Sequence, residues 1–232
     1  MNRSLTQALS ILSAFCLVAC TGRAQTPTAD DILRAARNNP MGEHAKLDAR
    51  LRTEDDEKMP FTITLDKGVV TYDFNNPDQD IILQLGQDSS DLKERVGGHT
   101  AEVKAARYDQ KVRGTPITYE DLALRLLYWP HPKLLGSDVI RTRPSWKIQV
   151  QAPKGQSQYG VALLWIDKES GAVLRIEGYD TQGRLVKRFE VIDAQKIDGV
   201  WMLRTMRVES IQPGTHHVTD RTYLEVTGKS KG

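Results

Sequence analysis

The sequence predicts an α+β fold that consists mainly of one antiparallel β-sheet. Between residues 159 and 209, runs rich in β-branched, aromatic and leucine residues alternate with turn sequences, of which Asp198-Gly199 is the sharpest. No helix-length insert separates these runs, so parallel βαβ connections are disfavoured. Only two segments, beginning near residues 28 and 118, have the pattern of helices. The runs therefore form a meander, and the rest of the chain packs against it or completes it.

Residues 1–19 have the pattern of an export signal. Arg3 supplies the positive charge, and Ala8–Ala19 is an apolar run too short to span a bilayer as a helix. The run ends in Leu17-Val18-Ala19-Cys20, which resembles the lipobox of bacterial lipoproteins. The resemblance implies lipidation of Cys20 and, in a Gram-negative cell, anchoring to the outer membrane on its periplasmic side. The alternative is ordinary cleavage after Ala24, which gives a soluble periplasmic protein.

The rest of the chain is predicted to comprise a short tether, residues 20–27, and a single domain, residues 28–232. Cys16 and Cys20 are the two cysteines of the sequence, so this domain has neither a disulfide nor a thiolate metal site. Arg3 is the single charged residue of 1–19, and removing that segment lowers the formal net charge from +2 to +1. This balance argues against a nucleic-acid partner.

In the first half of the domain, one helix precedes a series of strands. Thr28 is a suitable N-cap, and Asp30 and Asp31 place negative charge in the first turn, where the helix dipole favours it. Asn38-Asn39-Pro40 ends the helix. Apolar and turn-forming residues predict strands at residues 47–53, 60–65, 69–74, 80–85 and 92–96.

Residues 116–135 predict a second helix between two sets of strands. Thr118 and Asp121 have the spacing of a capping box, and Leu122 and Leu126 lie on one apolar helical face. The Trp-Pro-His-Pro sequence that follows ends the helix, because proline cannot continue it. Further strands are predicted at residues 138–142, 146–150, 159–167, 172–179, 184–192, 200–211 and 221–226.

Apolar residues occur on both faces of the meander strands, and two short helices cannot cover both faces of a sheet. A curved sheet with an apolar concave face and the helices as a lid resolves this, and its interior could hold an acyl chain. The candidate cavity residues are Leu124, Leu126, Leu127, Leu164, Ile166, Leu174, Ile176, Phe189, Met202, Met206 and Val208. The alternative is a fully packed core without a cavity.

Three segments resemble a known family: TYEDLALRLLYWPHPKLLG (118–136), LWIDKESGAVLRIEGYDTQGRLVKRFEV (164–191) and DGVWMLRTMRVE (198–209). They are similar to the periplasmic lipoprotein-sorting superfamily of LolA/LolB-like proteins. The resemblance implies a curved open half-barrel sheet with a helical lid, a cavity for the acyl chains of lipids or lipoproteins, and no catalytic activity. The lipobox departs from the soluble carrier of the superfamily and agrees with its membrane-bound receptor branch. No position here matches the local motif of the carrier's key arginine.

Signals for an enzyme are poor. The sequence contains no G-x-S-x-G, Walker or H-E-x-x-H motif. Adjacent residues on a strand point to opposite faces, so His216-His217 does not predict a metal site, and no cofactor is expected. Two function classes remain: a lipid- or lipoprotein-binding protein in outer membrane lipoprotein sorting, and an envelope protein-interaction or sensor domain with a filled core. In either case we expect a monomer.

Overall fold

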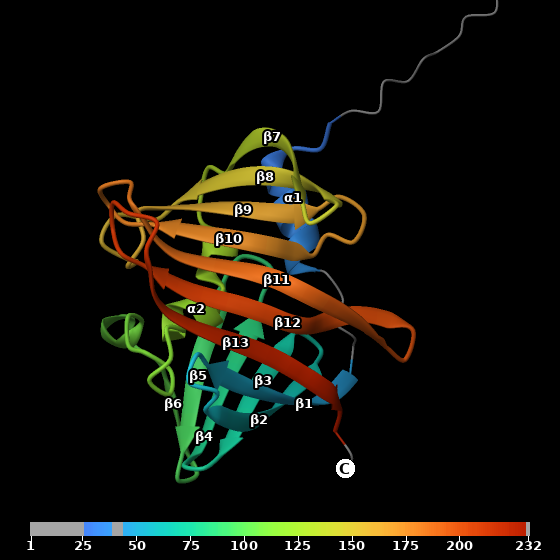
Figure 1. Ribbon diagram of the computed structural model, residues 1–232, viewed down its shortest axis with the longest axis vertical. Coiled ribbons are helices and arrows are strands. Elements are labelled where there is room, and N and C mark those ends of the chain that lie inside the picture. The colour runs from blue at the N-terminus through green and yellow to red at the C-terminus, as the bar shows by residue number, and fades with distance from the viewer. Residues whose placement is uncertain (1–25, 39–43, 231–232) are drawn as a thin grey trace, which may run out of the picture.

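The computed structural model describes residues 26–38 and 44–230 and contains one large antiparallel sheet (Figure 1). Its strands are β1 (His44–Thr53), β2 (Lys58–Asp66), β3 (Val69–Asn75), β4 (Asp78–Leu85), β5 (Ser90–Val96), β6 (His99–Glu102), β7 (Lys133–Ile140), β8 (Arg143–Gln151), β9 (Val161–Asp167), β10 (Val173–Tyr179), β11 (Leu185–Ile197), β12 (Val200–Ile211) and β13 (Val218–Lys229). The predicted mainly antiparallel fold is confirmed.

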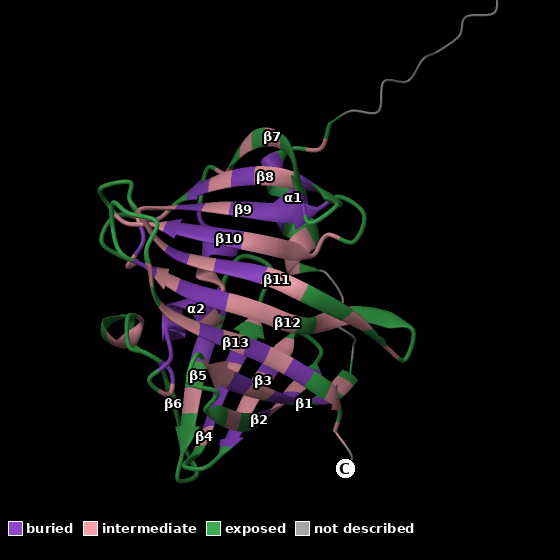
Figure 2. Ribbon diagram, viewed as in Figure 1, coloured by how far each residue is buried: buried purple, intermediate pink, exposed green. Residues whose placement is uncertain are grey.

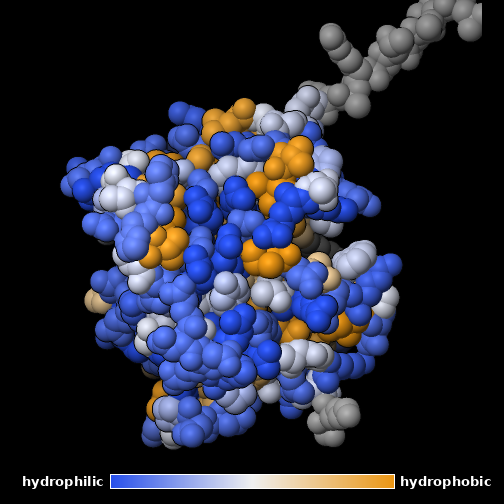
Figure 3. Space-filling view, in the orientation of Figure 1, coloured by the Kyte–Doolittle hydropathy of each residue, from blue (hydrophilic) through white to orange (hydrophobic). Residues whose placement is uncertain are grey.

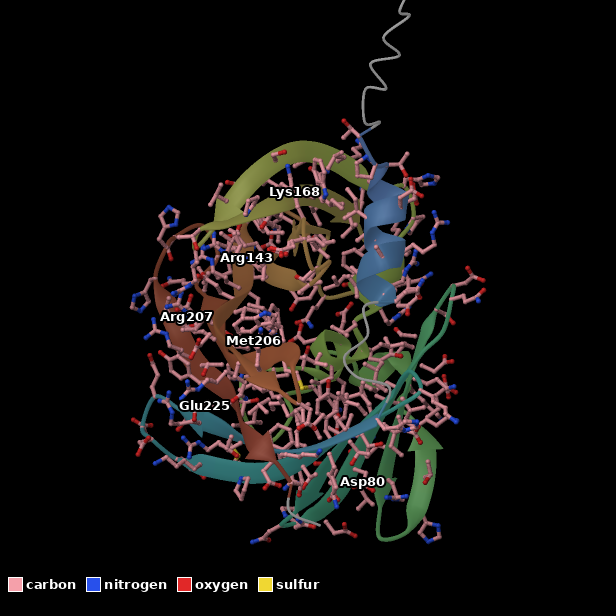
Figure 4. All side chains as sticks on the ribbon, turned by 90° about the vertical axis from the view of Figure 1, so that its right-hand side faces the viewer. Asp80, Arg143, Lys168, Met206, Arg207 and Glu225 are labelled. Carbon is pink, nitrogen blue, oxygen red and sulfur yellow. The ribbon has the colours of Figure 1, made fainter. Side chains whose placement is uncertain are left out.

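Two meanders meet in the middle of this sheet. The strand order is β6-β5-β4-β3-β2-β1-β13-β12-β11-β10-β9-β8-β7. The first meander therefore joins the second where β1 pairs with β13, for example Leu51 with Leu224. Strands β6 and β7 are the two edges, so the sheet is open, and it curves around an interior (Figures 1 and 4).

Short helices occupy the concave side of the sheet (Figure 4). They are α1 (Ala29–Arg37) and α2 (Tyr119–Ala123), with the 3₁₀ segments η1 (Ala105–Arg107) and η2 (Arg125–Tyr128) elsewhere along the chain. Helix α1 begins as predicted, because the Thr28 hydroxyl accepts a hydrogen bond from the Asp31 amide at 3.1 Å. Its Ile32 and Leu33 side chains are buried in the core. None of the helices in the described ranges is long and apolar enough to cross a membrane.

The second helix is shorter than predicted. Its capping box forms, with the Thr118 amide donating to the Asp121 carboxylate at 2.8 Å. The helix then ends after one turn because Leu124 adopts a left-handed conformation (φ 51°), and the chain continues as η2. This change of direction buries Leu126 and Leu127. The predicted continuous helix beyond Ala123 is therefore wrong.

Most predicted strands are confirmed, but one observed strand was not predicted and several boundaries differ, that of β7 by the most residues. Strand β6 was not predicted, because all four of its residues are exposed and give no apolar signal. Strand β7 begins at Lys133, before the predicted residue 138. Asp198 and Gly199 have φ angles of 50° and 83°, which confirms the predicted two-residue turn with positive φ at both positions.

The two faces of the sheet differ in polarity, and the buried residues form bands along the strands (Figure 2). Strand pairing places Leu164 beside Ile176 and Phe189 beside Val208 on the inner face. A register shift in β10 puts Val173, rather than Leu174, against the core. The prediction that Leu174 shares the inner face with Ile176 is therefore wrong, since a bulge interrupts the alternation of side chains.

Candidate functional site

The concave interior contains the residues that the sequence predicts as cavity lining, with Leu174 as the exception. One group is fully buried in the core cluster: Leu126, Leu127, Leu164, Ile166, Ile176, Phe189 and Val208. A second group is half-buried and packs against that cluster: Leu124, Met202 and Met206. Figure 4 shows Met206 on the inner side of the sheet. The sequence pattern thus predicts where these side chains lie, and a ligand for them stays a prediction.

This interior is almost filled in the structure. Leu164, Ile166 and Val208 are at most 1% exposed, and one cavity under the first meander has a volume of about 10 Å³, which is about the room that one water molecule needs. The cavity is lined by Leu51, Phe61, Tyr72, Phe74, Val112, Ile117, Leu122 and Leu224. These residues come from β1–β3, β13, the segment before α2 and α2 itself (Leu122), and none of them is among the predicted lining residues. An acyl chain would therefore need the interior to open.

A buried ion pair connects α2 to the sheet. Lys187 Nζ on β11 lies 2.7 Å from Asp121 Oδ2 on α2, and the two side chains are 7% and 1% exposed. The Tyr159 hydroxyl donates to Asp121 Oδ1 at 2.6 Å. Asp121 also caps its own helix through the Thr118 amide. One carboxylate thus holds the start of α2 and anchors it to β11, which makes α2 and η2 the lid segment of the interior.

The geometry of this anchor depends on a glycine. The Tyr159 ring lies so close to Gly178 on β10 that a Cβ atom there would approach Cε1 of the ring to 2.5 Å.

Burial, together with the Asp121 carboxylate, raises the pKa of Tyr159 well above its usual value. Tyr159 is therefore a neutral hydrogen-bond donor at physiological pH, which fits a structural role for the cluster.

Glu120, the neighbour of Asp121, is a second buried carboxylate in the lid segment. Its Oε2 accepts a hydrogen bond from the Gln158 amide at 3.0 Å. Its Oε1 has no hydrogen-bond partner within the described ranges. Burial raises the pKa of Glu120. Because its hydrogen bond from Gln158 ties the lid segment to the β8–β9 loop, Glu120 also has the character of an anchor.

An apolar hairpin tip projects from the body of the sheet (Figure 1). Trp201 is 66% exposed and Val200 is 44% exposed at the β11–β12 turn. Lys196 Nζ lies 5.1 Å from the centre of the Trp201 ring. Sequence reasoning missed this feature, although an apolar pair directly after a two-residue turn extends beyond any core. Met202 follows Trp201 and is half-buried against the core cluster, so apolar surface continues from the tip toward the interior.

An open cleft of about 440 Å³ lies beside the lid segment. It is lined by Asp88, Ser89, Ser90, Asp91, Glu102, Val103, Ala105, Tyr108, Arg125, Tyr128, Trp129 and Pro153. The Ser90 hydroxyl on β5 donates to the Ala123 carbonyl at 2.5 Å, which joins the end of α2 to the floor of this cleft. The cleft therefore adjoins the outer side of the lid and not the predicted cavity residues.

The remaining candidates give no reactive site. His216 and His217 are exposed in the turn between β12 and β13. Over residues 26–38 and 44–230, no group of three or more His, Cys, Asp or Glu side chains could hold a metal ion. Cys20, the predicted lipidation site, lies outside the described residues.

Comparisons with solved structures show the same architecture. A DUF1329 family protein from Desulfovibrio piger superposes with a TM-score of 0.66 at 16% identity, over 85% of this chain and 89% of that one. A domain from Vibrio parahaemolyticus, described as an outer membrane lipoprotein-sorting protein, superposes with a TM-score of 0.65 at 17% identity, over 86% of this chain and 90% of that one. A LolA superfamily protein from Nitrosomonas europaea superposes with a TM-score of 0.62 at 18% identity, over 89% of this chain and 95% of that one.

Sequence comparison adds one match. Among proteins with curated descriptions, none matches this chain. A family model described as "-like: Uncharacterized protein" matches residues 98–230, a span that begins before β6 and includes the whole second meander. Because this span is more than half of the 232 residues, the chain belongs to that family, and its fold is the one found in the LolA superfamily and in outer membrane lipoprotein-sorting protein domains.

Proposed function

We propose that the protein binds acyl chains of lipids or lipoproteins in the concave interior of its sheet and serves outer membrane lipoprotein sorting. The observation that carries this proposal is an apolar inner face covered by a short lid segment, in a fold shared with lipoprotein-sorting domains. Nothing in the described interior requires a cofactor for this role. Binding, and not catalysis, is the chemistry that buried aliphatic side chains offer to a ligand.

Binding on this proposal requires the lid segment to move. The cavity of about 10 Å³ holds no acyl chain, so α2 and η2 leave the inner face when ligand enters. Helix α2 has only five residues, but its opening breaks the Asp121–Lys187 pair, the Ser90–Ala123 hydrogen bond, and the hydrogen bonds that Tyr159 and Gln158 donate to Asp121 and Glu120. Burial of the acyl chain must offset the loss of these contacts.

The β11–β12 hairpin supplies an entry route. Trp201 and Val200 are exposed at its tip, and the half-buried Met202 and Met206 continue from it into the interior. Methionine side chains adapt their shape to irregular apolar partners, which suits a route for flexible chains. An acyl chain passing along β12 therefore meets Met202 and Met206 between the tip and the core, with the exposed Arg204 between them.

The location follows from the same proposal. Lipidation of Cys20 anchors the protein in the outer membrane, where it faces the periplasm as a monomer; cleavage after Ala24 places the same domain free in the periplasm. A multiply acylated cysteine holds a protein at a membrane firmly, whereas one chain gives marginal binding. In both cases the partner is the acylated end of a lipid or lipoprotein.

The second candidate is an envelope protein-interaction or sensor domain with a filled core. The nearly filled interior favours it. Native mass spectrometry of the purified domain distinguishes the two, because co-purified lipid appears as discrete added mass. Absence of lipid, together with failure to bind a fluorescent fatty acid or lipopeptide, supports the interaction domain.

A reversible disulfide between the lid segment and the sheet tests lid opening directly. The sequence from residue 26 onward contains no cysteine, so Ser90→Cys with Ala123→Cys introduces one pair at the contact between β5 and α2. Mass spectrometry confirms the disulfide. We expect the oxidised form to exclude the lipopeptide probe and the reduced form to bind it. The Ser90→Cys variant alone is the matched control, and equal binding by the oxidised and reduced forms contradicts lid opening.

A further inference from the structure

The outer face of the sheet carries an ordered layer of arginines that the acyl-chain proposal does not use. Glu190 on β11 receives ion pairs from Arg141, Arg175 and Arg207 at 3.0, 3.0 and 3.4 Å. These arginines come from the β7–β8 turn and from β10 and β12. Figure 4 shows Arg207 on the outer side of the sheet, and Figure 3 shows hydrophilic side chains over the middle strands with hydrophobic patches on either side of them.

The same arrangement repeats on the neighbouring strands. Glu209 on β12 receives Arg221 at 2.9 Å and Arg207 at 3.3 Å, with Arg188 at 3.7 Å. On β13, Glu225 forms ion pairs with two arginines of the neighbouring strand β1, Arg50 at 2.6 Å and Arg52 at 2.8 Å. The layer therefore runs without interruption from the β7–β8 turn, across β10–β13, to β1.

The two signs of charge lie at different depths. The side chains of Glu190, Glu209 and Glu225 are only 6%, 4% and 14% exposed. The arginine side chains that cover them are 26–49% exposed. Each guanidinium has five N–H donors in a planar fork and uses one or two on these glutamates, so donors remain toward solvent. The surface that a partner meets is therefore made of guanidinium groups.

The layer also carries an excess of positive charge. Seven arginines pair with Glu190, Glu209, Glu225, the adjacent Glu177 and the more exposed Glu54, which Arg221 also contacts at 2.9 Å. The set thus has two more positive than negative groups, and the whole chain is close to neutral at +2. An excess held in fixed positions is suited to recognising carboxylates or phosphates.

We propose that this arginine layer is a docking surface for an acidic, extended segment of a partner protein. The aromatic groups in the layer lie beneath guanidinium groups: Trp165 is 3% exposed and has Arg175 above its ring at 5.6 Å, and Tyr223 has Arg52 at 4.3 Å. The arginines thus cover these aromatic rings, and the hydrophobic patches on this face lie beside the layer and not within it (Figure 3). A flat bilayer also meets a convex sheet along a narrow line, whereas an extended chain follows its curvature.

The test compares two variants with equal loss of charge. Arg50→Gln with Arg141→Gln removes two of the more exposed guanidiniums of the layer, yet leaves Glu225 with Arg52 and Glu190 with Arg175 and Arg207. Arg34→Gln with Lys93→Gln is the control, because both residues are exposed and lie outside the layer. Thermal unfolding verifies both folds. Arg141→Gln alone, in the β7–β8 turn, replaces the double variant if that one is unstable.

The probe is a fluorescein-labelled oligoglutamate peptide, followed by fluorescence anisotropy with the full domain. We expect binding at low ionic strength that is lost near 1 M salt, where the Debye length is about 3 Å. The layer variant should bind about 3- to 30-fold more weakly, and the control should match the wild type. No binding at low ionic strength, or equal weakening in both variants, overturns the proposal. Binding to phosphatidylglycerol vesicles without binding to oligoglutamate also overturns it, in favour of a membrane surface.

Discussion

Replacing Lys187 by Met tests whether the buried ion pair holds the lid segment on the sheet. Lys187 Nζ lies 2.7 Å from Asp121 Oδ2, and methionine keeps the aliphatic length of lysine while removing its charge. Removing one partner of a buried pair costs about 3–5 kcal/mol, because the other charge stays buried without compensation. Asp121 retains hydrogen bonds from Tyr159 and from the Thr118 amide. We therefore expect the free energy of unfolding to fall by about 3 kcal/mol, the lower end of this range.

Urea denaturation at neutral pH measures this loss, and thermal unfolding should show a midpoint lower by about 6–12 °C for a domain of this size. The matched control is Lys229→Met. Lys229 pairs with Asp198 at 2.6 Å, but the side chains are 62% and 70% exposed, so the expected loss is below about 1 kcal/mol. Adding Asp121→Asn to Lys187→Met should restore part of the stability by removing the unpaired charge. If Lys187→Met destabilises the protein no more than Lys229→Met, the anchor does not hold the lid.

Three further predictions concern the membrane anchor, the interior and the response to acid. Wild-type protein should fractionate with membranes and Cys20→Ser should not; wild type found free in the periplasm and beginning after Ala24 refutes the lipobox. Ile176→Trp should cost about 1–3 kcal/mol by overpacking the filled interior, whereas unchanged stability with weaker lipopeptide binding would reveal an interior that is open in solution. Burial raises the pKa of Glu94, but hydrogen bonds from Arg107, Tyr119 and Gln79 outweigh it and lower the pKa to about 2. The stability that Glu94 contributes is therefore complete above its ordinary pKa of 4.5 and is lost as the pH falls toward 2, so wild type and Glu94→Gln should converge there in urea titrations; a gap that persists at pH 2 contradicts this.

The sheet was predictable because its signals are local. Turn residues with positive φ and alternating apolar side chains lie within a few positions of each other, as at Asp198-Gly199. The length of α2 was not predictable, since the left-handed conformation of Leu124 is stabilised by burial of the η2 side chains and not by any neighbouring residue type. The bulge at Leu174 likewise leaves no mark in the sequence.

The sequence indicates one partner of the ion pair that anchors the lid segment, and not the other. In the sequence Lys187 alternates with Leu185 and Phe189, a pattern that places a charge among apolar neighbours. In the structure a register shift puts Val186, rather than Leu185, beside Lys187 against the core. Such a position predicts that a partner exists. The partner, Asp121, is distant in sequence and already has a role as part of a capping box, so periodicity alone could not identify it.

The pairing of β1 with β13 has a consequence for how the protein is made. Each meander forms from contacts between neighbouring strands, but the ladder from Leu51–Leu224 to Ala49–Val226 joins residues near the two ends of the domain. Closing so long a loop costs conformational entropy before the strand contacts can stabilise it, so the pairing of β1 with β13 is a slow step of folding. A chain that is made with its N-terminus first therefore exposes the unpaired edge of β1 until β13 has followed. Synthesis thus passes through a stage in which the first meander presents an open strand edge, a surface that is prone to aggregation.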